Sequence, residues 1–283
     1  MYEPKYLPQL NNSANSLGKM RFAILYENKY FSVDDPNSDP LHLHEYLEIF
    51  VNLSSDVTFL VKNNVYRVGQ RDAVLTRPSD THVCIFNRNE IHEHCCIWID
   101  ADFALPEFDF LKKTDFCPLF SFDEQTKTKL KGLVLSLLSA CENGGSELEK
   151  SAYILQILTL FEKNGKESEG LVSVPKQLQN ILDDIHAHFF EVSNVTDLIK
   201  NNFVSSATLN RWFRKYIHTS PREYLESVRL SNAVTMLQNG ASVTDACMSS
   251  GFSDCSHFIV LFKKKFGVTP FQYKKNQKEK ASR

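Results

Sequence analysis

The last third of the chain contains one pattern twice, as NVTDLIKNNFVSSATLNRWFRKY (residues 194–216) and again as SVTDACMSSGFSDCSHFIVLFKKK (residues 242–265). The triplet VTD begins at Val195 in the first copy and, 48 residues later, at Val243 in the second. In both copies a second apolar stripe with helical spacing follows the triplet. The repeat indicates that one small helical unit occurs twice.

Each copy predicts two short helices joined by a tight turn. Asn194 and Ser242 each stand three residues before an aspartate, which is the pattern of a helix N-terminus. The turn follows at Asn201-Asn202 in the first copy and at Gly251 in the second, since these residues tolerate left-handed backbone. Helix, turn and helix in this order form the helix-turn-helix motif.

The second helix of the first copy, expected over residues 206–216, leaves a polar face exposed once its apolar stripe packs inward. Asn210 can pair with adenine and Arg211 can bind guanine through two hydrogen bonds. Arg214 and Lys215 are better placed for phosphates. The alternative is an ordinary solvated helix face. The candidate DNA-binding residues of this copy are Ser205, Ser206, Ala207, Asn210, Arg211, Arg214 and Lys215.

The corresponding helix of the second copy, capped by Ser253 or Asp254, presents no Arg or Asn to the expected base edges. We therefore expect mainly phosphate contacts, with methyl and hydroxyl contacts to bases. Residues 221–238 between the copies predict a helix of ~27 Å, long enough to set the two units about one DNA turn apart. The candidate DNA-binding residues of this copy are Asp254, Cys255, Ser256, His257, Val260, Lys263 and Lys264.

Four motifs stand out in the C-terminal part of the chain. They are Leu209-x-Arg211-x-Phe213-Arg214, Ser220-Pro221-x-x-Tyr224-Leu225, Gly251-Phe252-x-Asp254 and Gly267-x-Thr269-Pro270-x-x-Tyr273. With these motifs, residues 176–275 resemble the DNA-binding domain of AraC/XylS-type transcription regulators. The resemblance implies that Ala207, Asn210 and Arg211 occupy the major-groove positions of the first unit. The chain departs from the family at Val260, where a basic residue is usual, and this puts base reading by the second unit in doubt.

The 283-residue chain, with 42% hydrophobic and 23% charged residues, is long enough for two domains. Residues 176–283 carry 15 Lys and Arg against 9 Asp and Glu, whereas residues 1–175 carry 17 against 25. A basic C-terminal part suits a polyanionic partner such as DNA. No apolar run approaches the ~20 residues of a membrane span, and the polar start does not resemble an export signal, so we expect a cytoplasmic protein. The seven scattered cysteines predict reduced thiols.

Short apolar runs separated by turn residues occupy residues 21–122 and predict an antiparallel β-barrel or sandwich, with a hairpin at Lys62-Asn63-Asn64. Two amphipathic helices over residues 123–164 follow as a hairpin that either covers the barrel or forms a dimer. The expected fold is thus multidomain α+β, a β-barrel with a helical hairpin and then an all-α domain with two helix-turn-helix motifs joined by a long helix. The remaining segments are an N-terminal arm (1–20), a polar linker (165–175) and a basic tail (276–283).

Four side chains of the stretch HLHEYLE, His42, His44, Tyr46 and Glu48, are expected on one face of a strand, with His82 nearby. The arrangement is similar to cupin barrels, where three histidines and a carboxylate surround a metal, and the effector domains of many AraC-type regulators are cupin-like. Three interpretations stay open. These are a divalent metal site at His42, His44, Glu48 and His82, a metal-free effector pocket that also includes Tyr46, or a solvated strand face.

A second histidine pair, His92 and His94, precedes an apolar run and has no partner set at ligand spacing. We expect it at a strand edge.

The sequence therefore predicts a DNA-binding transcription regulator, not an enzyme, controlled by a small molecule for which sugars are candidates. It requires no cofactor, although a divalent metal is an alternative. The expected partners are double-stranded DNA, the effector, a second copy of the chain and RNA polymerase, with no membrane. Two rival hypotheses are a metal-dependent cupin enzyme with a DNA-binding tail and a regulator whose front domain only dimerises.

Overall fold

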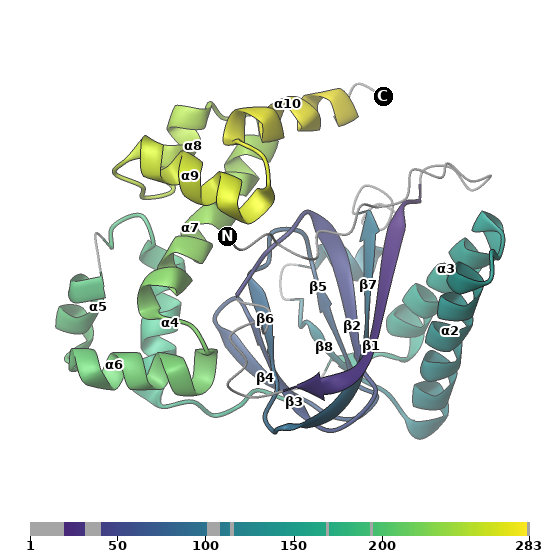
Figure 1. Ribbon diagram of the computed structural model, residues 1–283. Helices are drawn as coiled ribbons and strands as arrows, with labels where there is room; N and C mark the ends of the chain where they lie inside the picture. Colours follow the sequence, from purple (N-terminus) through teal and green to yellow (C-terminus); the bar gives the residue numbers. More distant parts are fainter. Residues whose placement is uncertain are drawn as a thin grey trace.

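The computed structural model describes residues 20–31, 41–100, 108–113, 116–167, 170–192 and 195–281. The expected arm up to residue 19, the capping residue Asn194 and the last two residues of the basic tail lie outside these ranges. An antiparallel β part is followed by a helical part, as the sequence predicted (Figure 1). No helix in the described ranges is long and apolar enough to span a membrane.

The β part consists of two antiparallel sheets that face each other (Figure 1). In spatial order, the larger sheet contains β1 (Phe22–Phe31), β7 (Glu90–Asp100), β2 (Tyr46–Asn52), β5 (Ala73–Thr76), β8 (Leu119–Ser121) and β9 (Lys166–Glu167). The smaller sheet contains β4 (Asn64–Val68), β3 (Val57–Val61) and β6 (His82–Ile85). A short 3-10 helix, η1 (Asp109–Lys112), precedes β8. Aromatic rings fill the interior, and those of Phe50 and Phe59 lie 5.0 Å apart between the sheets.

The described strands do not form one continuous hydrogen-bonded barrel. Two isolated bridges connect the sheets among the described residues. In one, the backbones of His42 and His82 exchange two hydrogen bonds of 3.0 and 2.8 Å, and in the other Tyr66 of β4 pairs with Leu171, in the segment that follows β9. The expected hairpin is present, since β3 and β4 pair up to Val61 and Asn64 and leave Lys62 and Asn63 as the two-residue turn.

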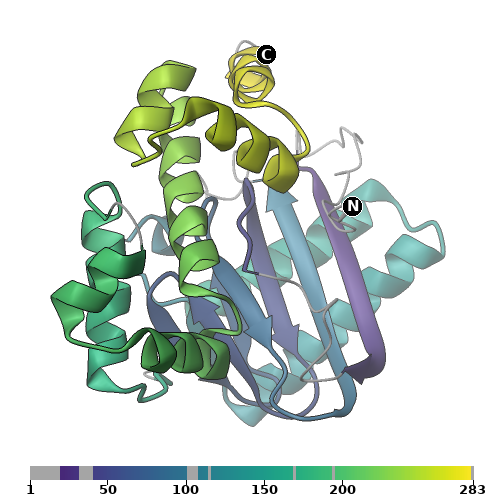
Figure 2. The same cartoon turned by 60° about the vertical axis from the view of Figure 1, so that its left-hand side comes forward.

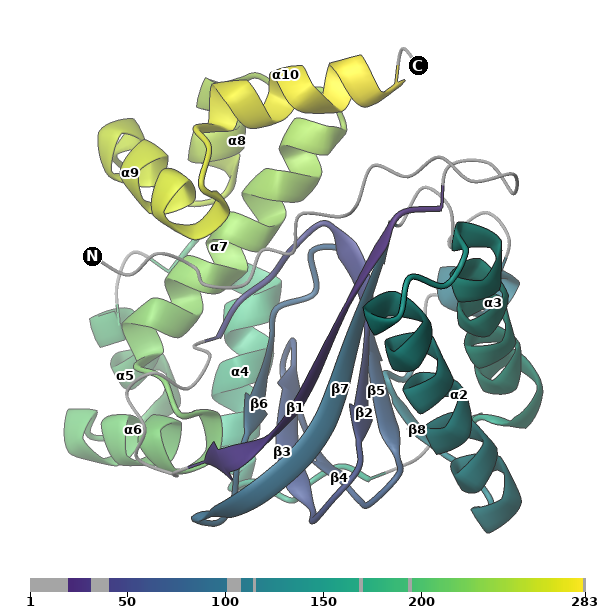
Figure 3. The ribbon, with the colours of Figure 1, turned by 45° about the vertical axis from the view of Figure 1, so that its right-hand side comes forward.

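Helices α2 (Glu124–Glu142) and α3 (Glu147–Asn164) form the expected helical hairpin. The Asp123 and Ser146 side chains cap their N-termini by accepting backbone N–H groups. Their apolar stripes bury the outer face of the larger sheet, in a core that contains Leu137, Ile157 and Ile97 (Figure 3). The hairpin therefore covers this sheet.

The segment expected to be a free linker is hydrogen-bonded to the β part. Strand β9 pairs with β8, and the carbonyl of Gly170 accepts the N–H of Arg67 at 2.8 Å. The N–H of Val172 then donates to Val65 at 2.7 Å. The reason is that edge strands β8 and β4 offer unpaired backbone groups, which this segment satisfies.

The helical part contains α4 (Lys176–His188), α5 (Val195–Asn202), α6 (Ser206–Trp212), η2 (Phe213–Ile217), α7 (Pro221–Gln238), α8 (Val243–Ser249), α9 (Cys255–Phe266) and α10 (Pro270–Ala281). Helix α7 has the predicted length and begins with a capping box formed by Ser220 and Glu223. One difference concerns the helix expected over residues 206–216. It continues beyond Trp212 as the π-helical turn η2, which buries Phe213 and Ile217 completely.

Helix α7 runs beside the smaller sheet and connects the two helical units (Figure 2). The hydroxyl of Tyr224, on α7, donates to the carbonyl of Lys62 at 2.7 Å. Leu60 and Val83 of the smaller sheet share a buried cluster with Ile181 of α4. The β part and the helical part are therefore packed against each other.

Candidate functional site

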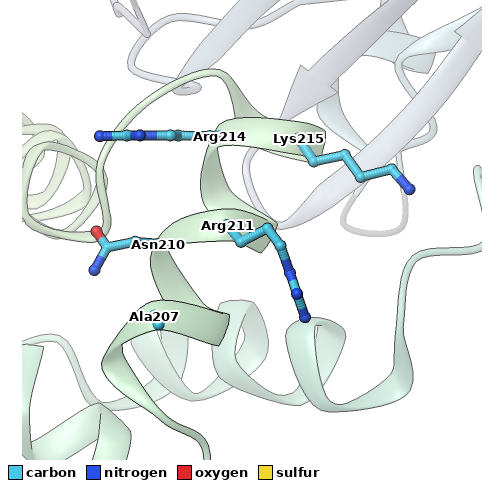
Figure 4. Close-up of a pocket in the computed structure, with 5 residues that line it drawn as sticks. All are labelled: Ala207, Asn210, Arg211, Arg214 and Lys215. Carbon is cyan, nitrogen blue, oxygen red and sulfur yellow. The ribbon is translucent and has the colours of Figure 1, made fainter.

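The first helical unit presents an open depression lined by Ala207, Asn210, Arg211, Arg214 and Lys215 (Figure 4). Asn210 and Arg214 extend to the same side, whereas Lys215 points away from them (Figure 4). Within the described chain, Arg211 and Arg214 are exposed and have no ion pair or hydrogen bond. The structure thus brings five of the seven candidate residues of this unit together with both guanidinium groups accessible.

The polar residues at the start of α6 stabilise the helix itself. The Ser205 hydroxyl accepts the N–H of Thr208 at 3.0 Å, so it is the N-cap. The amide of Asn210 donates to the carbonyl of Ser206 at 2.8 Å. To bind a base edge, the Asn210 amide has to leave this local hydrogen bond.

In the second unit, α9 exposes Ser256, His257, Val260, Lys263 and Lys264, as predicted from the periodicity, and Val260 is 65% exposed. Two further candidates are placed differently.

The Asp254 carboxylate accepts the N–H groups of Ser256 and His257 and caps α9. Cys255 is half-buried against the core of the second unit. Asp254 is therefore exposed but forms the cap that the sequence allowed for, whereas Cys255 is not an exposed outward residue.

Lys265 follows Lys263 and Lys264 in the same run but was not among the candidate DNA-binding residues, and the structure places it differently from them. Its ammonium group donates to the carbonyl of Leu41 in the β part, while Lys263 and Lys264 stay in solvent. Burial lowers the pKa of Lys265 to about 8, although the carboxylate of Glu223 acts in the opposite direction. The three consecutive lysines gave no signal for this contact, because it joins segments 224 residues apart.

The second candidate site lies at the junction of the two sheets and contains His42, His44, Glu48 and His82. One potential ligand atom from each side chain lies within 4.8 Å of the others. The Glu48 carboxylate oxygen Oε2 is 2.7 Å from His44 Nε2 and 3.3 Å from His82 Nε2, and it accepts the Trp98 indole N–H at 2.7 Å. His44, Glu48 and His82 are buried and His42 is half-buried. This burial contradicts the interpretation of these residues as a solvated strand face.

Contrary to the sequence prediction, the four residues His42, His44, Tyr46 and Glu48 do not lie on one face of a single strand. Strand β2 begins only at Tyr46, and the preceding segment crosses to the smaller sheet, where His42 pairs with His82. The Tyr46 ring lies 5.9 Å from the His44 ring and packs against the interior cluster. The predicted residues therefore meet, but through a crossing of the chain.

Electrostatics at the site favour an ionised carboxylate. Burial alone would raise the pKa of Glu48, yet the charge of His82 and the hydrogen bonds from both imidazoles hold it well below its usual range. Burial would lower the pKa of His82, but Glu48 raises it. Glu48 is thus a buried anion with hydrogen-bond donors around it.

His92 and His94 were expected at a strand edge, and this prediction is wrong. Strand β7 is paired on both sides, by β1 and β2, and both imidazoles are buried between the sheets. His94 stacks on Phe50 at 5.1 Å, and burial lowers its pKa to about 3.

All seven cysteines are free thiols, as expected.

Comparison with known proteins identifies the helical part. Residues 199–276 match the family model described as a helix-turn-helix domain. The uncharacterized HTH-type transcriptional regulator YbfI of Bacillus subtilis is 26% identical over 221 residues, 77% of this chain and 80% of the relative. The HTH-type transcriptional activator RhaR of Mannheimia succiniciproducens is 22% identical over 248 residues, covering 83% and 87%.

An HTH-type transcriptional activator RhaS of Escherichia coli is 32% identical over 127 residues, 44% of this chain and 45% of the relative. Among solved structures, ToxT of Vibrio cholerae is similar with a TM-score of 0.39 and 14% identity, covering 94% of this chain and 98% of ToxT.

The two helical units and the sequence matches define a DNA-binding helix-turn-helix transcription regulator. Within that class, the chain is of the AraC type.

Proposed function

We propose that this regulator reads DNA under the control of a small effector held by His42, His44, Glu48 and His82. The observation that carries the proposal is the convergence of these four side chains at a buried position. Burying a carboxylate costs free energy unless the carboxylate is paired with donors or a cation. A buried cluster of polar side chains such as this one is therefore typical of a ligand-binding site. An effector controls DNA binding only if it prefers one arrangement of the protein over another.

The donor set fits a divalent transition-metal ion. Imidazole nitrogen and carboxylate oxygen are ligands that iron, manganese, cobalt, nickel and zinc accept. His82 Nδ1 is 2.8 Å from the Asp80 carbonyl and His44 Nδ1 is 3.2 Å from the Tyr46 carbonyl, which leaves the Nε2 atoms facing Glu48. Such outer contacts orient metal ligands. When bound, the ion supplies two positive charges and a fixed coordination to this junction.

A small polar organic molecule, for which sugars are candidates, is the second proposed effector. Thr76 is the cross-strand partner of Glu48, and its buried hydroxyl has no hydrogen-bond partner among the described residues. The same holds for the hydroxyl of Thr81, next to His82. Since buried polar groups are normally satisfied, a hydroxyl-bearing ligand is the alternative to a metal at this junction.

The proposed partners are double-stranded DNA at both helical units, a second copy of the chain and RNA polymerase. The relatives are named as transcription regulators and activators, which supports regulation over catalysis. The rival metal-dependent enzyme predicts turnover by the metal-loaded protein, and the regulator whose front domain only dimerises predicts no ligand at all.

Metal removal and reloading test the effector site. The full chain is stripped with a chelator and titrated calorimetrically with Mn²⁺, Fe²⁺, Co²⁺, Ni²⁺ and Zn²⁺. We expect one ion per chain, with binding lost in Glu48→Gln and His82→Gln. The matched control is His257→Gln, which changes an exposed histidine on α9 and should bind the ion normally. If no ion binds the wild type and a sugar raises its Tm, the metal is excluded in favour of the organic effector.

A further inference from the structure

The second helix of the first unit, α6 continued by η2, has one buried side and two exposed rows of side chains. Leu209, Phe213 and Ile217 are completely buried and fix the inward side. Side chains four positions apart lie above one another on a helix, so the outward side divides into two parallel rows. The first row is Ser206, Asn210 and Arg214, and the second row is Ala207, Arg211 and Lys215, all of them exposed.

The long side chains of the two rows extend to different sides of the helix. Asn210 and Arg214 extend one way, whereas Arg211 and Lys215 extend the other way (Figure 4). Residue type alone groups Arg214 with Lys215 as phosphate contacts. The structure instead places Arg214 in one row with Asn210, the candidate for an adenine contact.

Arg214 is free to bind a partner in this row. Its side chain is exposed, and among the described residues its guanidinium group has no ion pair or hydrogen bond. Four helical residues advance ~6 Å along the helix axis. Successive base pairs of DNA are about 3.4 Å apart. Asn210 and Arg214 are therefore spaced for bases that lie one or two steps apart.

The chemistry of this row matches the major-groove edges of two purines. An asparagine amide pairs with N6 and N7 of adenine, and the fork of an arginine binds O6 and N7 of guanine. A phosphate contact requires only a positive charge, which the ammonium group of Lys215 supplies from the other row.

We propose that Arg214 reads a guanine in the major groove, one or two base pairs from an adenine bound by Asn210. Arg214 is then a specificity-determining residue of the first unit, and Lys215 is the phosphate contact. Arg211 reads a different base, because it extends to the other side of the helix. This inference rests on the proposed function, in which the first unit binds double-stranded DNA.

Atomic substitution in the DNA tests the contact directly. The probe is a duplex that the wild-type full chain selects from a random-sequence pool, in which each guanine in turn is replaced by 7-deazaguanine. This replacement removes the N7 acceptor and keeps the base pair. We expect one guanine whose replacement weakens wild-type binding about 5-fold or more but does not affect binding by Arg214→Ala. Such non-additive losses identify a direct contact.

Arg211→Ala and Lys215→Ala are the matched controls from the other row. Both should retain the full response to 7-deazaguanine at that position. Lys215→Ala should also weaken binding to selected and random duplexes alike. The slope of log affinity against log salt, the salt slope, should become shallower by about 0.9 in this control.

Asn210→Ala locates the second base of the row. Each adenine of the selected duplex is replaced in turn by 7-deazaadenine. We expect one adenine, one or two base pairs from the guanine of Arg214, whose replacement weakens wild-type binding but leaves binding by Asn210→Ala unchanged.

Three outcomes would overturn the inference. They are a response to 7-deazaguanine that Arg214→Ala retains at every position, a wild type that responds at no guanine, and an adenine of Asn210 more than two base pairs away. In each case DNA reading by the regulator survives, because the wild type still prefers the selected duplex. Failure of the wild type to select any sequence would instead refute the proposed DNA reading together with the role of Arg214.

Discussion

Arg211 has the properties of a base-reading residue, because it is exposed, unpaired among the described residues and next to Asn210 in one depression. We expect Arg211→Ala to weaken binding to the cognate site by ~1–3 kcal/mol and to relax its sequence preference. Fluorescence anisotropy with cognate and random duplexes measures both effects. An equal loss on the two duplexes would exclude base reading by this residue.

Lys264→Ala is the matched control for a phosphate contact. It should weaken binding to cognate and random DNA alike and reduce the salt slope by about 1.

Val260→Ala should leave cognate binding nearly unchanged, since the second unit offers no base-reading side chain at that position. A strong loss of specificity in Val260→Ala would show that the second unit reads sequence after all.

At the scale of the element, Asp254 shows how a candidate contact becomes a structural residue. Its carboxylate accepts two N–H groups at the start of α9, which also places the negative group at the positive end of the helix dipole. We expect Asp254→Ala to lower the free energy of unfolding by about 0.5–2 kcal/mol. Urea denaturation of the full chain measures this loss.

Asp254→Ser separates capping from DNA contact, because serine caps a helix without a negative charge. We expect near-normal stability and unchanged or slightly stronger DNA binding in this variant. A large loss of DNA affinity at normal stability would restore Asp254 to the list of DNA contacts.

For the whole molecule, His186 reports on the packing of the β part against the helical part. Burial first, and then the charge of Lys62, lowers its pKa to about 4, and its Nε2 atom is 3.0 Å from the Tyr224 hydroxyl. The unfolded chain, with a histidine pKa of ~6.5, binds more protons than the folded chain between pH 4 and 6.5. The contribution of His186 to the free energy of unfolding is therefore fully present above pH 6.5 and decreases as the pH drops towards 4.

We expect His186 to account for at most about 2 kcal/mol of the stability lost between pH 7 and pH 5. Urea denaturation at both pH values, in wild type and His186→Gln, isolates this contribution from that of His94. The variant should lose less stability than the wild type on acidification. Equal losses in the two proteins would show that His186 is not protonated on unfolding in this range.

Local patterns were sufficient to predict most of the elements and much of the candidate sites. One error is the turn of the first unit, because Asn201 and Asn202 end α5 and the left-handed residue is Phe203. Helix caps, apolar periodicity and turn residues act within a few positions, so α7, the helical hairpin and the outward face around Arg211 could be derived from the chain alone. The stretch HLHEYLE and His82 likewise predicted the members of the buried site. Their chemistry depends on residue type, which is visible in the sequence.

The tertiary structure decided how these parts meet. The crossing of Leu41–His44 between the sheets, the pairing of β9 and of residues 170–172 with strand edges, and the burial of His92 and His94 depend on contacts between distant segments. The same is true of Lys265, whose partner lies in the other part of the molecule. Sequence periodicity shows which face of an element is apolar, but which surface covers that face is decided only when the whole chain packs.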